Sequence, residues 1–231
     1  LKFSAKADTL PTLKGLNFDE KDAFVIESNA GNDSICYWIK DSLVYQMDTL
    51  AIQMDYLYTD SLNQLVPKTD TIYLANKLTR AQKEKLAKKE AEEKEKERKK
   101  KEKKGEKIEP DPTPFLKMNV DAPSSFDINK NIVLTFEEPV VRIDTSAIRV
   151  NVKEDTLWVK TPFLLVADSV IPRQYEILAG WEPEKEYQLQ IDSAAITGLY
   201  GLHTNKVEQT LKVKKLDEYG TLLLNLPGGE Q

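Results

Sequence analysis

The stretch DTLAIQMDYLYTD, residues 48–60, decides the fold class of this 231-residue chain. Its large side chains fall on every second position, at Leu50, Ile52, Met54, Tyr56 and Tyr58. Successive side chains of a β-strand point to opposite faces, so a period of two predicts a strand with these five residues on one buried face. We therefore expect the chain to bury its apolar side chains in stacked sheets.

Short β-prone runs lie on both sides of this strand. They are AFVIES at residues 23–28, SICYWI at 34–39 and TDTIYL at 69–74. The first two runs are separated by the turn-forming cluster Asn29-Ala30-Gly31-Asn32-Asp33. Residues 1–75 are therefore predicted to form an N-terminal β module.

A highly charged segment follows this module. Residues 76–109 contain 15 Lys or Arg and 9 Asp or Glu, whereas the rest of the chain has a net charge of −11. Thr79 and Gln82 have capping-box spacing, and Gly105 stands where a helix C′ glycine belongs. Glu-to-Lys pairs four residues apart recur between them, which favours a helix. Residues 79–104 are thus predicted to form a long, solvated helical linker, because the interleaved Glu residues argue against binding to nucleic acid or anionic lipid.

Residues 110–216 again have the pattern of strands. NIVLTF at 131–136 places Ile132, Leu134 and Phe136 inward, and EYQLQID at 186–192 places Tyr187, Leu189 and Ile191 inward with Gln188 and Gln190 outward. Short strands at regular intervals, without an amphipathic helix between them, predict an antiparallel sandwich. The run YGTLLLNL at 219–226 predicts one more strand, so residues 217–231 are expected to open a further β module.

Several blocks of the second module occur in a recognisable order. NIVLTFEEPV at 131–140 is a strand ending in Thr-Phe and a Glu-Pro-Val turn, and IDTSAIRV at 143–150 is a short polar stretch and a strand. YQLQI at 187–191 and AITGLYGL at 195–202 are a Tyr-led strand and a glycine turn. With these blocks the chain resembles the bacterial Ig-like modules of S-layer and surface proteins, the SbsA type. Thr197 stands where that family often has an aspartate.

The wider layout resembles Ig-like surface lipoproteins of the Bacteroidetes. WIKDS at 38–42, DTL at 48–50 and YTDS at 58–61 look like their preceding module, and YGTL at 219–222 looks like the start of their following transthyretin-like module. The resemblance implies a mainly β chain of tandem Ig-like antiparallel β-sandwich modules joined by a long charged α-helix. It also implies export to the outer membrane, cell surface or periplasm, with membrane contact only through a lipid anchor upstream of these residues.

Few residues could carry chemistry. His203 is the only histidine, and the sequence has no G-x-S-x-G motif to supply the serine of a Ser–His–Asp triad. His203 is therefore predicted to be an exposed loop residue. Cys36 is the only cysteine, which excludes an internal disulfide, and its β-prone run predicts a small buried hydrophobe. We therefore expect no enzyme activity. The two acidic modules would repel nucleic acid.

Candidate ligand contacts are equally few. Asp41, Asp48, Asp55, Asp60 and Asp70 offer oxygen atoms to calcium, but they form no EF-hand pattern, and turns explain them as well. No cofactor is therefore expected, with calcium as the alternative. Trp38 and Trp158 lie in strands and are expected in the core. Trp181, in the loop AGWEP at 179–183, and Tyr200, in the glycine turn, are the candidate ligand contacts, and the alternative for Trp181 is a cover over the end of the sandwich.

These observations predict a non-catalytic, monomeric structural or interaction protein of the cell surface or periplasm. Its partner would be an unknown protein or glycan. The alternative function is an accessory glycan-binding module of a surface polysaccharide-uptake or enzyme system.

Overall fold

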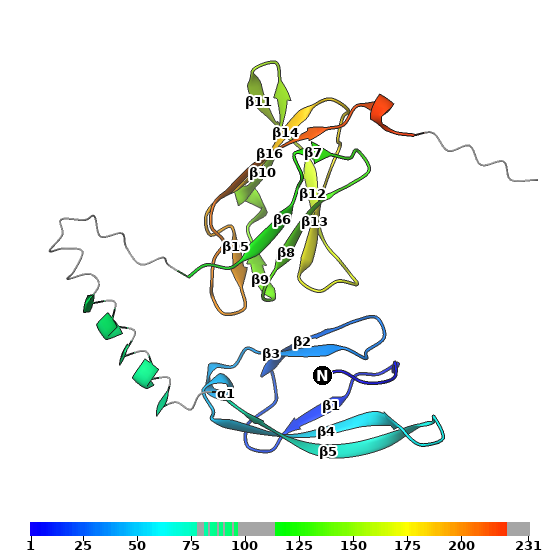
Figure 1. Ribbon diagram of the computed structural model, residues 1–231, viewed down its shortest axis with the longest axis vertical. Helices are drawn as coiled ribbons and strands as arrows, with labels where there is room; N and C mark the ends of the chain where they lie inside the picture. The colour runs from blue at the N-terminus through cyan, green and yellow to red at the C-terminus, as the bar shows by residue number, and fades with distance from the viewer. Residues whose placement is uncertain are drawn as a thin grey trace, which may run out of the picture. The chain divides into compact units, whose positions relative to one another are not determined.

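The computed structural model describes residues 1–77, 81–82, 84–86, 88–89, 91–93, 95–96 and 114–220. Contacts divide the chain into two compact units, Leu1–Pro114 and Phe115–Gln231. Both are built mainly from strands in antiparallel sheets, which confirms the mainly β class that the sequence predicts (Figure 1).

A long hairpin dominates the N-terminal unit. Its strands β4 (Thr49–Thr59) and β5 (Leu65–Ala75) pair antiparallel over all 11 residues of each, and β1 (Thr12–Gly15) pairs with the other side of β4. Asp60 holds the turn, because its Oδ1 accepts the backbone N–H groups of Leu62 at 2.9 Å and Gln64 at 2.8 Å. Asp commonly fixes turns in this way.

A second hairpin, β2 (Phe24–Ser28) and β3 (Ile35–Ile39), leads into the short helix α1 (Ser42–Tyr45). Asp41 caps α1 by accepting the N–H of Leu43 at 2.8 Å. The buried cluster of the unit is formed by Ala23, Val44, Leu50 and Ile52, with Leu13, Phe18, Phe24, Ile39 and Met47 packed against it. The three-stranded sheet and the β2–β3 hairpin thus share one small core.

The long charged helix predicted over residues 79–104 is not seen. Scattered described positions between 81 and 96 have helical backbone, but the intervening positions and all of 97–113 lie outside the described residues. The strand predicted at 219–226 also lies outside them from residue 221 onward. In the described part of the chain, no helix is both long and apolar enough to cross a membrane.

Two larger sheets lie in the described part of the C-terminal unit. One has the order β12 (Phe163–Ala167), β13 (Gln174–Ala179), β8 (Ile132–Phe136) and β6 (Met118–Asp121). The other has the order β11 (Leu157–Thr161), β10 (Ile148–Glu154), β14 (Glu186–Ile191), β16 (Val207–Val213) and β7 (Ser125–Phe126). Only the β16–β7 pair is parallel among the described pairs.

Shorter elements complete the unit. β9 (Val140–Ile143) and β15 (Ile196–Gly198) form a separate two-stranded sheet with a register shift at Thr197 and Gly198. Two 3₁₀ turns are η1 (Thr145–Ala147) and η2 (Leu216–Glu218). The second turn falls at the start of the module predicted for residues 217–231.

The core of the C-terminal unit draws side chains from both sheets. Ile132, Leu134 and Phe136 from β8 and Tyr187, Leu189 and Ile191 from β14 are all at most 2 % exposed. Period-two alternation therefore identified the inward faces of both strands correctly. A shared core between two sheets is what a β-sandwich requires.

Candidate functional site

An open apolar groove lies between the two layers of the N-terminal unit. Its volume is about 320 Å³. Every strand of the unit contributes lining side chains, among them Leu13 of β1, Phe24 of β2, Ile39 of β3, Leu50 of β4, and Ile72 and Leu74 of β5. Leu74 is 50 % exposed and Leu1, which also lines the groove, is 45 % exposed. Contiguous apolar surface that stays open to water is typical of an interaction site.

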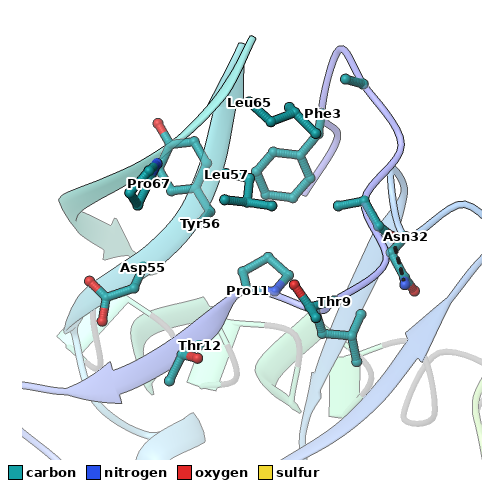
Figure 2. A pocket seen from close by; sticks show the side chains of 13 residues that line it. Phe3, Thr9, Pro11, Thr12, Asn32, Asp55, Tyr56, Leu57, Leu65 and Pro67 are labelled. Carbon is teal, nitrogen blue, oxygen red and sulfur yellow. Dashed lines mark hydrogen bonds between the residues drawn. The ribbon is translucent and has the colours of Figure 1, made fainter.

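A second pocket of the same unit mixes aromatic and polar side chains (Figure 2). Its volume is about 220 Å³. The rings of Phe3 and Tyr56 lie 5.5 Å apart at 44°. Thr12, Asn32 and Asp55 add hydroxyl, amide and carboxylate groups to the lining. Figure 2 shows the ring of Phe3 beside Tyr56 and Leu57 of β4, with Asn32 on the opposite side of the pocket.

Beside this pocket, Asp70 connects two side chains on the inner face of the hairpin. Its Oδ2 accepts a hydrogen bond from the Tyr56 hydroxyl at 2.6 Å and lies 2.9 Å from Lys68 Nζ. The hydrogen bond from Tyr56 lowers the pKa of Asp70, and the same bond raises the pKa of Tyr56. Because the Lys68 and Asp70 side chains are 45 % and 40 % exposed, water screens their ion pair, which contributes little to stability.

Of the two predicted ligand contacts, Trp181 is buried and Tyr200 is exposed. Trp181 is 8 % exposed and packs edge-on against Phe126 at 5.1 Å and Tyr187 at 4.9 Å. It therefore covers the core, as the alternative reading of its loop proposed, and little of its ring remains for a ligand. Tyr200 is 49 % exposed, in the turn beside Gly201.

Two predictions of burial are wrong. Cys36 was expected to be a small buried hydrophobe, but it is exposed. Trp158 was expected in the core, but it is 39 % exposed on β11, with Lys153 Nζ 5.9 Å from its ring centre. Trp158 lies on the edge strand β11. Cys36 lies on the face of β3 opposite to Ile35 and Tyr37, because successive side chains of a strand alternate between its faces. Trp38 is partly buried and its Nε1 donates to Glu27 at 2.8 Å.

The remaining candidates have structural roles. His203 is exposed, as predicted, and its Nδ1 lies 3.1 Å from the Thr197 hydroxyl. Asp41 caps a helix, Asp60 holds a turn, and Asp55 accepts from the Thr69 hydroxyl at 2.6 Å. In the described residues, no three His, Cys, Asp or Glu side chains gather as a metal site would require.

Sequence reasoning missed one unusual group, the carboxyl of Glu138. The residue is 7 % exposed, and its Oε1 has no hydrogen-bond partner among the described residues. The backbone of Tyr200 hydrogen-bonds this carboxyl, while burial raises its pKa above the ordinary value. Gly198 makes room for it, since a Cβ there would overlap the carboxyl. The Glu-Pro-Val turn and the glycine turn, noted separately in the sequence, thus meet in the fold.

No family model and no curated protein matches this chain. The function of the chain is therefore inferred from the geometry of these sites and from the sequence resemblance.

Proposed function

We propose that this chain is a non-catalytic interaction protein of the cell surface or periplasm, and that its N-terminal unit binds a partner protein. The observation that carries the proposal is the open apolar groove of about 320 Å³. Filling it would remove half-exposed aliphatic side chains such as Leu74 from water, which is the main source of free energy in protein association. Export is supported by the resemblance of the second module to bacterial surface Ig-like modules.

Selection of displayed peptides against the immobilised full chain tests the groove. Leu74→Cys in a Cys36→Ser chain places a single thiol in the groove, because Leu74 lines the groove and is 50 % exposed and Cys36 is the only cysteine. Selected peptides should slow the reaction of this thiol with a chromogenic disulfide reagent. They should lose affinity for Leu74→Asp, which puts a charge into the groove, and keep it for Tyr73→Asp, whose side chain is 71 % exposed on the opposite face of β5. Peptides that bind Leu74→Asp as tightly as the natural chain would contradict the proposal.

The exported location needs its own experiment. An epitope-tagged full-length gene product in its own host should be cleaved by protease added to intact cells, or be released with the periplasmic fraction. Retention of the tag inside osmotically stable spheroplasts would contradict export.

The aromatic pocket in Figure 2 favours a second candidate function, the binding of glycan. Sugars stack on aromatic rings and hydrogen-bond with carboxylate, amide and hydroxyl groups, and Phe3, Asp55, Asn32 and Thr12 supply all of these. A glycan array should then give a signal that Phe3→Ala abolishes and Leu74→Asp preserves. Trp181→Ala would be a poor probe, because it removes a core residue. A signal that survives Phe3→Ala would eliminate this pocket as the glycan site.

A further inference from the structure

β5 is an edge strand with a free side. It pairs with β4 along its whole length and, among the described residues, with no other strand. Pro67 shows which backbone groups face outward. It lies opposite Leu57 and has no N–H, so this pair cannot be a hydrogen-bonded pair of the β4–β5 ladder. Hydrogen-bonded and non-bonded pairs alternate, so the outward-facing N–H and C=O groups belong to Thr69, Thr71, Tyr73 and Ala75.

An independent contact supports this assignment. Ala51 lies opposite Tyr73, and its C=O accepts the N–H of Leu16 at 2.9 Å on the β1 side of the sheet. Ala51 therefore points its backbone groups away from β5, and Tyr73 must point its own away from β4.

On β5, the side chains that line the groove belong to residues whose backbone groups bond to β4. Ile72 and Leu74 lie opposite Ile52 and Leu50 and line the groove, whereas Tyr73 is 71 % exposed on the other face. Directly paired residues of neighbouring strands project from the same face of a sheet. A strand added to this edge would therefore place the residues opposite Ile72 and Leu74 over the groove.

Only part of the edge is open to pairing. Pro67 and Lys68 protect the end near the turn, because proline offers no N–H and lysine is a common block on edge strands. Residues 69–75 lack such protection and span about 20 Å at about 3.4 Å per residue. A row of unpaired backbone donors and acceptors can be satisfied in register only by another extended backbone.

We propose that the N-terminal unit captures an extended strand of a partner protein, which pairs with residues 69–75 of β5 and inserts alternate aliphatic side chains into the groove. This inference rests on the proposed function and specifies the partner. Residues 1–77 contain 11 Asp or Glu and 7 Lys, so Lys or Arg flanking the inserted strand would complement their charge.

A second copy of the chain is the disfavoured occupant of this edge. It would bring a second N-terminal unit with the same excess of 11 Asp or Glu over 7 Lys, and like charges brought together at an interface oppose association. A partner strand flanked by Lys or Arg is therefore favoured.

Amide hydrogen exchange of the full chain, measured by NMR, tests the edge directly. The probe is a synthetic peptide of about nine residues with valine at alternate positions, threonine between them and lysine at both ends. At saturation, exchange of the outward-facing amides of residues 69, 71, 73 and 75 should slow by more than about tenfold. The amides of Asp70, Ile72 and Leu74 should change little, because they already bond to β4.

Two matched changes isolate the backbone contribution. Thr71→Pro removes an N–H group that faces away from β4, as the natural Pro67 also does, so the hydrogen bonds between β4 and β5 stay intact. Thr71→Val keeps this N–H. The proline variant should bind the peptide about fivefold or more weakly, and the valine variant should match the natural chain. N-methylation of the peptide amides that face β5 should weaken binding by a similar factor. This measurement uses the natural chain, so it still tests the proposal if Thr71→Pro fails to fold.

The outcomes are separable. A peptide that shields the Leu74→Cys thiol but leaves the four amides and the Thr71→Pro affinity unchanged would overturn strand addition and leave groove binding intact. If neither this probe nor any selected peptide shields the Leu74→Cys thiol, both proposals fall. Protection of the four amides in the chain alone, with light scattering showing a dimer, would replace the partner strand with a second copy.

Discussion

Replacing Glu138 by glutamine should stabilise the C-terminal unit near neutral pH. The carboxyl is almost fully buried against the glycine turn, and Oε1 has no hydrogen-bond partner among the described residues. Burial raises the pKa of Glu138, and the hydrogen bond from the Tyr200 backbone offsets this only in part. Glutamine has nearly the same shape and never ionises.

The sign of the effect follows from proton linkage. The folded unit holds the Glu138 proton more tightly than the unfolded chain does, so Glu138 contributes most stability below its unfolded pKa of about 4.5. That contribution is lost as pH rises through the higher folded pKa. Burying an ionised carboxylate costs more than burying a neutral amide, so the advantage of Glu138→Gln should grow from near zero at about pH 4 to about 1 kcal/mol or more at pH 7.

Urea unfolding of the full chain measures this difference. With Trp38 and Trp158 replaced by Phe, Trp181 remains as a single fluorescent reporter inside the C-terminal core. Glu137→Gln is the control, because Glu137 pairs with Lys117 at 3.2 Å and its side chain is 66 % exposed. An advantage that is constant with pH, or larger in acid, would refute the reasoning about Glu138.

Three further perturbations test the packing. Gly198→Ala should destabilise the C-terminal unit by about 1–3 kcal/mol, since its Cβ would overlap a buried carboxyl, whereas Gly180→Ala enters open space and should leave the urea midpoint unchanged. Trp181→Ala should cost about 3–5 kcal/mol in urea unfolding and Trp158→Ala less than about 0.5 kcal/mol, and equal losses would contradict their different burial. Cys36 should react with a disulfide reagent in the folded chain, and a thiol that reacts only in urea would show that it is buried.

Alternation along single strands predicted which face of a strand is buried, but not which residues of that face are covered by other segments. On β4, Leu50, Ile52 and Met54 are each 5 % exposed, as predicted, whereas Tyr58 on the same face is 48 % exposed. The buried cluster beneath the sheet includes Leu50 and Ile52 but not the tyrosine. A period of two gives the direction of a side chain, and only the packing of other segments decides whether water reaches it.

The outer face of β14 shows the opposite departure. Gln188 was predicted to point outward to solvent, yet it is only 8 % exposed. Its Nε2 donates to Glu208 at 2.8 Å and its Oε1 accepts from Gln190 at 3.0 Å. β14 lies between β10 and β16, so long polar side chains from neighbouring strands cover one another.

The site residues depended on contacts that local patterns do not contain. Trp181 is buried because its loop returns to Phe126, and Glu138 is buried because the glycine turn at Gly198 packs on it. The groove likewise needs β5 and the β2–β3 hairpin together. The sequence could have drawn attention to Glu138 through its position before a proline, but not to its missing hydrogen-bond partner.

The parallel pair at the edge of the five-stranded sheet has a consequence for biosynthesis. Among the described strands, β7 joins this sheet only through β16, where Ser125 and Phe126 pair with Lys212 and Val213. Translation delivers Val213 about 87 residues after Phe126, a delay of about 4–17 s at about 5–20 residues per second. During that interval Phe126 emerges from the ribosome before the strand that will hold it. A message cut short before the codon for Val213 would yield a product that lacks this contact.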